Sequence, residues 1–277
     1  MSASYHFHRL RRALGNFSLL QHRHCAGHLA SMHQSGTHWL KFMLASALAR
    51  HYGVPGPKYN HANDLIGGPH DRPEYPQLPR LLSAHSIPHP LLSLRITHAV
   101  WRLPPYAVLV RDIRASLVSN YEKWRARYDC PFSEFLRGDP AGRRYNSDIW
   151  WCFRFLNAWE AVRRTAPERV LVLRYEDLQQ DTPAGLARVA AHFGLALQAE
   201  DIAVGIAAGT KDQMAAREDP ARPKGAVNAG ARAVADYFSA EDRQWFTAQC
   251  ARYLASDYGY DYARWDDESR GAATSSA

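Results

Sequence analysis

A short apolar segment, a glycine turn and an apolar helix follow one another near the start of this chain and constrain its fold most. Residues 28–32, His-Leu-Ala-Ser-Met, favour a buried strand, and residues 39–48 carry apolar side chains at helical spacing. Between them, Gly36 allows a sharp turn, and the first N–H groups of the helix are unpaired at the positive end of its dipole. The stretch therefore predicts either a phosphate-binding turn or an ordinary capped helix after a loop.

A second apolar run has a similar organisation. Residues 106–110, Tyr-Ala-Val-Leu-Val, indicate a buried strand that ends at Arg111, and a helix is expected over residues 113–127. Ser119 lies about two turns into that helix. A guanidinium at a strand tip and a hydroxyl on the next helix can together hold a phosphate. Arg114 is another candidate for the phosphate ligand; the alternative interpretation is that its side chain is simply exposed to solvent.

Strands and helices alternate along the remaining chain, which predicts one α/β domain with a central parallel sheet flanked by helices. Ligands of such sheets gather at the carboxyl ends of the strands. The residues at or just after predicted strand ends are Ser35 to Thr37, His85, Arg111 and Tyr175. The other expected elements are strands at 81–85 and 170–174, and helices at 146–164, 183–194, 199–208 and from Ser239.

Four sequence blocks, in this order, resemble the sulfotransferase family that uses 3′-phosphoadenosine 5′-phosphosulfate (PAPS). Residues 34–40, QSGTHWL, resemble its 5′-phosphosulfate loop, and residues 79–85, PRLLSAH, the segment with its catalytic histidine. Arg111 to Ser119 is similar to its 3′-phosphate motif, and residues 170–178, VLVLRYEDL, to a later strand and motif. The resemblance covers roughly residues 30–262.

The resemblance implies a P-loop-like fold and transfer of the sulfuryl group of PAPS to a hydroxyl of a small-molecule, sugar or lipid acceptor. The product would be 3′,5′-ADP, and no metal is expected. His85 is the expected general base, because imidazole titrates near neutral pH; a capped loop histidine, as at His89, is the alternative.

The resemblance also assigns cofactor contacts. Trp39 is expected to stack on the adenine or to anchor its helix in the core, whereas Glu176 and Asp177 are expected to be structural. Backbone N–H groups and a hydroxyl for the 5′-phosphosulfate come from Ser35, Gly36, Thr37 and His38. The 3′-phosphate and adenine contacts fall on Arg111, Ser119, Tyr175, Thr210, Arg222, Lys224 and Gly225.

Two departures from the family pattern bear on activity. The basic residue that usually precedes Ser-Gly-Thr, and that touches the bridging oxygen and the leaving phosphate, is Gln34 here. A glutamine donates a hydrogen bond but carries no charge. The late loop has Pro223 where arginine is usual and lacks the tryptophan after its glycine, so that Arg222 is the expected replacement. The cations that could substitute for the missing charge are His33, His38, Lys41 and Lys224.

Length and composition support a single globular domain. The chain has 277 residues, a formal charge of +7 and four scattered cysteines without metal-ligand spacing. A multiply anionic co-substrate accounts for part of the basic surplus, and no nucleic-acid motif is present. No apolar run approaches the ~20 residues of a membrane span, so a cytoplasmic protein is expected. We expect a basic arm at 1–28, the sulfotransferase domain at 29–262 and a disordered tail at 263–277.

The sequence leaves two alternatives open. One is a protein of the same fold that binds PAPS or 3′,5′-ADP but is catalytically impaired, as Gln34 suggests. The other is a P-loop kinase or NTPase, which the absence of GxxxxGK[ST] disfavours. Acceptor-binding loops are expected at 53–80 and 125–146, and residues 209–233 are expected to form a mobile polar loop.

Overall fold

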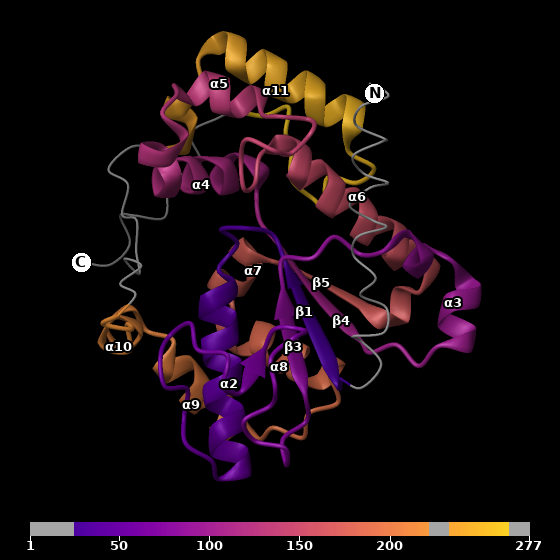
Figure 1. The fold of residues 1–277 in the computed structure, drawn as a ribbon, viewed down its shortest axis with the longest axis vertical. Coiled ribbons are helices and arrows are strands. Elements are labelled where there is room, and N and C mark those ends of the chain that lie inside the picture. Colours follow the sequence, from indigo (N-terminus) through magenta and orange to yellow (C-terminus); the bar gives the residue numbers. More distant parts are fainter. Residues whose placement is uncertain (1–24, 222–232, 266–277) are drawn as a thin grey trace.

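Five parallel strands form the centre of the structure, a computed structural model that describes residues 25–221 and 233–265. The strand order is β2-β3-β1-β4-β5, so the first two long strands of the chain, β1 and β3, are neighbours and β4 pairs with the other side of β1 (Figure 1). The strands are β1 (Gly27–Ser31), β2 (Ile66–Gly67), β3 (Leu81–Ala84), β4 (Tyr106–Val110) and β5 (Val170–Arg174).

Alternating side chains of the buried strands enter two separate hydrophobic cores. In β4, Tyr106, Val108 and Val110 face one core, and Ala107 and Leu109 face the other. This period of two is expected of a strand that is covered on both faces. The sheet is therefore the middle layer of a three-layer fold.

Three long helices cover one face of the sheet. Helix α2 (Thr37–Tyr52) crosses it beside α8 (Thr182–His192) and α9 (Ala199–Ala208) (Figure 1). The fit between α2 and α9 is close, because a Cβ at Gly205 of α9 would lie 2.5 Å from the carbonyl oxygen of Met43.

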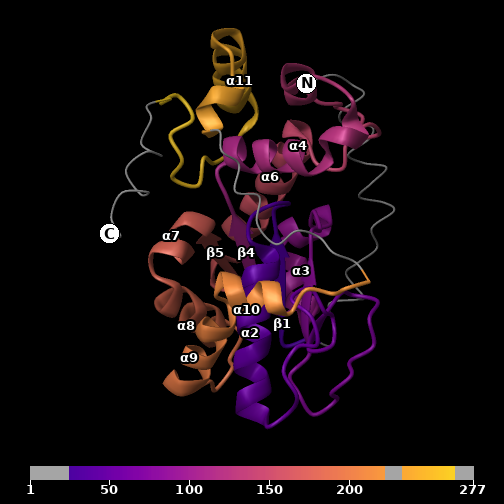
Figure 2. The same ribbon diagram turned by 90° about the vertical axis from the view of Figure 1, so that its left-hand side faces the viewer.

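The opposite face is covered by α6 (Ile149–Thr165), whose aromatic residues enter the core. A group of helices lies beyond the carboxyl ends of the strands, as Figures 1 and 2 show. These helices are α4 (Ile113–Tyr128), α5 (Phe132–Arg137) and α11 (Ala240–Tyr253). The short elements are η2 (Pro90–Ser93), α3 (Arg95–Val100), η3 (Pro167–Arg169), α7 (Tyr175–Gln180), α10 (Lys211–Ala216) and η4 (Val234–Tyr237).

The predicted fold class is confirmed, with corrections in the loops. The stretch 53–80, predicted as irregular, contains β2, and the stretch 209–233, predicted as a mobile loop, contains α10. Helix α10 has no buried residue and lies against the loop before β2, where the Asn60 amide donates 2.9 Å to the Met214 carbonyl. Such a helix has no apolar periodicity for a sequence to reveal. Residues 1–24, most of the expected arm, and 266–277 of the expected tail lie outside the described residues.

The contact between α2 and α9 gives a stability prediction. Gly205→Ala should lower the free energy of unfolding by about 1–3 kcal/mol, because the new methyl group overpacks against the backbone of α2. Urea unfolding followed by circular dichroism measures the change. Gly56→Ala is the control, because a Cβ at Gly56 meets nothing within 4 Å. Equal stabilities of the two variants would contradict the prediction.

Candidate active site

The loop between β1 and α2 turns at Gly36, which has φ 83° and is the N-cap of α2. A Cβ there would lie 2.5 Å from Cε2 of Tyr175, so glycine is needed both for the backbone and for the packing of the tyrosine ring. No side chain caps α2, whereas an aspartate or serine side chain caps α4, α6, α8 and α11. The first-turn N–H groups of α2 thus remain available to an anion.

Two side chains of the β4–α4 unit hold this loop by its backbone. Nη1 of Arg111 donates a 2.7 Å hydrogen bond to the Gln34 carbonyl, and the Ser116 hydroxyl donates 2.6 Å to the His33 carbonyl. Gln34 has φ 58°, an uncommon conformation for a residue other than glycine. The tethers fix this strained turn in place.

Arg111 retains donors that no described residue uses. Its guanidinium lies 4.7 Å from the centroid of the Tyr175 ring, and its Nε is buried without a hydrogen-bond partner. A buried, unpaired guanidinium N–H is costly, and an oxyanion would satisfy it. Ser119, on the next helix, is half-buried, and its hydroxyl has no hydrogen-bond partner among the described residues. Both predicted 3′-phosphate ligands therefore have unused hydrogen-bonding capacity.

His85 lies directly after β3, beside the end of β1. Its Nδ1 is 2.9 Å from the carbonyl oxygen of Ser31 and 3.2 Å from the Ser31 hydroxyl. A carbonyl only accepts, so Nδ1 carries the proton and Nε2 of the neutral ring has the lone pair. Burial lowers the pKa of His85, and the charge of Lys123 lowers it further, against the effect of backbone hydrogen bonds to Ser31 and Met32. His85 is therefore a neutral imidazole with an unprotonated Nε2.

The His33 ring stacks on His85 with centroids 4.1 Å apart, and the Trp151 ring packs against His33 in a T-shaped arrangement with centroids 4.6 Å apart. Burial, followed by the charges of His85 and Lys123, lowers the pKa of His33 to about 3. His33 is thus neutral near pH 7. In this state His33 therefore carries no positive charge that could replace the missing cation at position 34.

The other suggested cations differ in their surroundings. Lys41 is buried and donates to the side chain of Asn63, while His38 is exposed and lies 6.4 Å from the His61 ring. Lys224, Arg222 and Gly225 lie outside the described residues. Arg114, the rival phosphate ligand, is instead bound by Asp112, with Nη2 2.6 Å from Oδ2, and by the Arg264 carbonyl.

The predicted adenine contacts lie beside the loop. The Trp39 ring is 6.1 Å from that of Tyr175, and its indole N–H donates 2.9 Å to the Gly209 carbonyl. This bond supports the anchoring role of Trp39. Thr210 follows Gly209 and is exposed. Glu176 is structural as expected, since it accepts from the Asp112 N–H and from the Tyr260 hydroxyl.

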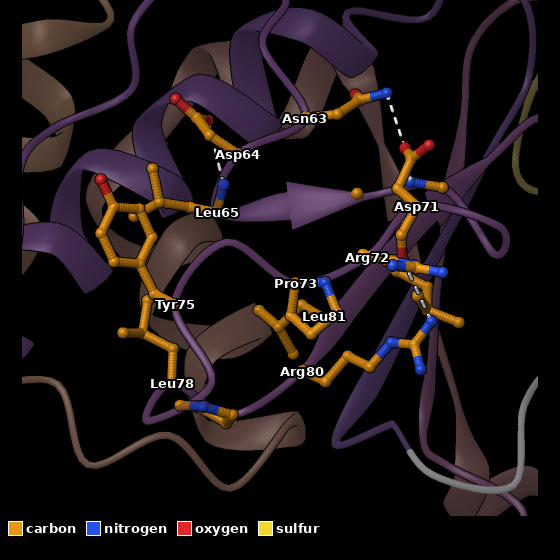
Figure 3. Close-up of a pocket in the computed structure, with 14 residues that line it drawn as sticks. Asn63, Asp64, Leu65, Asp71, Arg72, Pro73, Tyr75, Leu78, Arg80 and Leu81 are labelled. Atoms are coloured by element: carbon orange, nitrogen blue, oxygen red, sulfur yellow. Dashed lines mark hydrogen bonds between the residues drawn. The ribbon is translucent and has the colours of Figure 1, made fainter.

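A pocket beside the edge strand β2 is separate from this rim (Figure 3). Its lining includes Asn63, Asp71 and Arg80, and it reaches Leu81 and Leu82 at the amino end of β3. His85 follows the opposite end of that strand. The pocket thus contains none of the residues predicted to bind the nucleotide.

Comparison with known proteins identifies the family. A family model described as the sulfotransferase domain matches residues 28–220. The chain belongs to the sulfotransferase family. A zebrafish (Danio rerio) protein, Sulfotransferase 6B1, is 29% identical over 136 residues, which are 45% of this chain and 40% of that protein. The matched part therefore spans less than half the length of this relative.

Solved structures share the fold of this family member. Mouse sulfotransferase SULT7A1 complexed with PAP superimposes with a TM-score of 0.60 at 17% identity, covering 87% of this chain and 90% of the other. Retinol dehydratase with androsterone and inactive cofactor PAP has a TM-score of 0.53 at 18% identity, covering 88% of this chain and 84% of that chain. Retinol dehydratase with retinol and PAP has a TM-score of 0.54 at 18% identity, covering 91% of this chain and 88% of that chain.

Sequence reasoning missed several groups around the histidine of this sulfotransferase-family chain. They are Ser31, Ser116, Lys123 and Trp151. Ser116 and Lys123 precede and follow Ser119 at helical spacing, a signal that could have identified them. Ser31 and Trp151 reach the site through tertiary packing, which leaves no local pattern.

Two further observations concern the described residues of the chain. They contain no cluster of three or more His, Cys, Asp or Glu side chains that could hold a metal ion. None of their helices combines the length and the apolar character that crossing a bilayer requires.

The stacked histidines predict a pH-dependent stability. Below its ordinary pKa of 6.5 an unfolded His33 binds a proton, while the folded one stays neutral down to about pH 3. The free energy of unfolding should therefore fall as the pH falls through this window, and His85 acts in the same direction. His33→Phe keeps a stacking ring that cannot titrate. Its free energy of unfolding should therefore fall less between pH 7 and pH 5 than that of the wild type.

Urea unfolding at both pH values measures this difference. His70→Gln is the control, because His70 is exposed. If His33→Phe lost as much stability as the wild type between the two pH values, the stacked pair would not be the cause.

Proposed function

We propose that this sulfotransferase-family protein transfers the sulfuryl group of PAPS to a hydroxyl of a small-molecule, sugar or lipid acceptor, with His85 as the general base. The observation that carries the proposal is the combination of a neutral imidazole held through Nδ1 by the Ser31 carbonyl and a neighbouring loop whose anion donors are unused. A reaction that deprotonates an alcohol and expels a phosphate needs both groups. The cytoplasmic location and the absence of a metal stay predictions from the sequence.

The residues present fit the nucleotide at both of its ends. The first-turn N–H groups of α2 and the Thr37 hydroxyl would hold the 5′-phosphosulfate, although that hydroxyl donates 2.8 Å to Ser31 here. The buried Nε of Arg111, with the Ser119 hydroxyl, would hold the 3′-phosphate. Tyr175 packs between Gly36 and the Arg111 guanidinium and would border the nucleotide between its two phosphates.

In this reaction, Nε2 of His85 accepts the acceptor hydroxyl proton while the acceptor oxygen bonds to sulfur. The bond between sulfur and the bridging oxygen breaks, and that oxygen leaves with the 5′-phosphate as 3′,5′-ADP. The Ser31 carbonyl keeps the imidazole oriented and stabilises the imidazolium that forms. The loop donors stabilise the leaving phosphate.

The acceptor is proposed only as a class. One solved relative, retinol dehydratase, was crystallised with androsterone and with retinol, both apolar molecules that carry a hydroxyl group. The neutral His33 ring lies beside His85, with the Trp151 ring packed against His33, and this aromatic, uncharged cluster would suit such a molecule. These observations favour apolar alcohols within the wider class.

Transfer of labelled sulfate from PAPS to a panel of phenols, sterols, sugars and lipids tests the proposal. We expect transfer to at least one acceptor, together with release of 3′,5′-ADP. Tight binding of 3′,5′-ADP without transfer to any acceptor would favour the catalytically impaired binding protein. Binding of ATP in preference to PAPS would favour the kinase or NTPase.

Gln34→Lys tests how the enzyme manages without the usual cation. His33 is neutral, and the buried Lys41 amine donates to Asn63, so neither is expected to supply a charge to the leaving group. We therefore expect Gln34→Lys to raise turnover by about tenfold, equivalent to about 1.4 kcal/mol of barrier. Turnover with a saturating acceptor measures the effect, and Gln34→Met, which removes the amide donor, is the control. A lysine variant no faster than the wild type would show that another cation already serves.

A further inference from the structure

The segment from Pro90 to Arg102 presents an unusual surface. Four of its side chains are exposed although they are large and apolar: Leu91, Leu94, Ile96 and Val100, at 40%, 47%, 63% and 65% of their full areas. The only other large apolar residues so exposed in the described ranges are Tyr52 and Val204. The remaining exposed residues of the segment are Pro90, Arg95, Ala99 and Arg102. The exposed residues of this segment are therefore all apolar or cationic, and we call them the α3 surface.

The inner side of the same segment is well anchored. Leu92 and Thr97 are buried, and the Ser93 carbonyl accepts a 3.0 Å hydrogen bond from Thr165 of α6. Just beyond α3, the Leu103 carbonyl accepts 2.7 Å from Arg169. The apolar side chains thus face outward on a fixed scaffold, and the exposure does not come from a loosely packed segment.

The charged residues that neighbour the α3 surface in the sequence are all positive. No aspartate or glutamate occurs between Glu74 and Asp112. Neither Arg95 nor Arg102 forms an ion pair with a described residue. An exposed acidic residue on the adjoining η3, Glu168, lies 3.9 Å from Nε of Arg169, which offsets its charge. Whatever covers the α3 surface should therefore be both apolar and anionic.

We propose that the α3 surface docks on an anionic lipid bilayer. Leu91, Leu94, Ile96 and Val100 enter the boundary between headgroups and acyl chains, and Arg95 and Arg102 meet lipid phosphates. A second copy of this chain fits the charge less well, because two such surfaces would bring cations together without an acidic group between them. Six residues of helix cannot cross a bilayer, so the contact is peripheral.

The position of the surface leaves the proposed active site accessible. Helix α3 lies at the side of the molecule, towards the amino ends of β4 and β5, while the phosphate loop opens at the carboxyl ends (Figure 1). A bilayer on α3 would border the domain without covering His85. Docking is therefore independent of whether the proposed sulfuryl transfer is correct.

Co-sedimentation of the full chain with vesicles tests the proposal. We expect binding to vesicles of equal parts phosphatidylglycerol and phosphatidylcholine, and much weaker binding to phosphatidylcholine alone. Ile96→Ser combined with Val100→Ser should weaken binding at least about tenfold, because two exposed apolar side chains lose their transfer into lipid. Arg95→Gln and Arg102→Gln should each weaken it about fivefold.

Matched substitutions elsewhere on the surface are the controls. Val204→Ser, at a site that is 41% exposed on α9, and Arg188→Gln, at an exposed site on α8, should bind vesicles like the wild type. No binding of the wild type to anionic vesicles would overturn the proposal, as would binding that the α3 variants leave unchanged. A dimer in sedimentation velocity that Ile96→Ser and Val100→Ser convert to monomer would assign the surface to a second copy instead.

Discussion

Replacing His85 with asparagine is expected to lower turnover by about 10²–10⁴-fold, because the variant has no base to accept the acceptor proton. The asparagine amide can still donate to the Ser31 carbonyl, as Nδ1 of His85 does. The loop and the affinity for 3′,5′-ADP should therefore stay unchanged. Single-turnover transfer of labelled sulfate, with calorimetry for the nucleotide, separates the two effects. Near-wild-type transfer by the variant would reduce His85 to a structural residue.

The pH profile provides an independent check on His85. A base works in its neutral form, and burial holds its pKa below the ordinary value of 6.5. Turnover should therefore stay level as the pH falls through 6.5 and should decline only at lower pH. The residual activity of His85→Asn should lack this acid limb. His89→Asn is the matched control, because His89 caps η2 and should leave the profile of the wild type intact.

Arg111→Gln is expected to remove the preference for 3′,5′-ADP over 5′-AMP. The buried Nε and the free edge of the guanidinium are the donors proposed for the 3′-phosphate, and charged hydrogen bonds of this kind contribute about 10- to 100-fold each. The affinity for 5′-AMP should change less. Calorimetric titration of both nucleotides measures the ratio of the two affinities.

The Arg111 variant also loses its tether to the Gln34 carbonyl, so a control is needed. Ser116→Ala cuts the neighbouring tether to the His33 carbonyl and keeps the guanidinium. It should weaken both nucleotides together and preserve the preference. A preference that survived Arg111→Gln would remove Arg111 from the 3′-phosphate site.

The parts of this fold that the sequence predicted are those with strong local patterns. The strand ends that place Gly36, His85 and Arg111 were predictable because a buried run and the turn after it are adjacent in the chain. Parallel pairing then brings these ends to one edge, which the pairing of β1 with β3 and β4 confirms. The roles proposed for these residues remain predictions.

The contacts between distant segments were not predictable. Ser31 and His85 are 54 residues apart in the sequence. The stacking of His33 on His85 depends on the tertiary position of the loop after β1 relative to the end of β3. Burial in this stack keeps His33 neutral. The residue type alone does not reveal that burial, so from the sequence His33 was among the possible cations. Helix α10 was missed because contacts to the loop at Asn60 stabilise it, and its own side chains have no apolar pattern.

The two tethers on the loop have a consequence for how the ends of a nucleotide would communicate. Arg111 would touch the 3′-phosphate with one part of its guanidinium while another part holds the backbone carbonyl before Ser35. In the proposed function, filling one end therefore restricts the motion of the group that shapes the other end. Thermodynamic reciprocity then requires each end to strengthen the binding of the other by the same factor. A nucleotide that carries both phosphates would bind more tightly than its two halves predict, so the site would measure the distance between the phosphates as well as their charge.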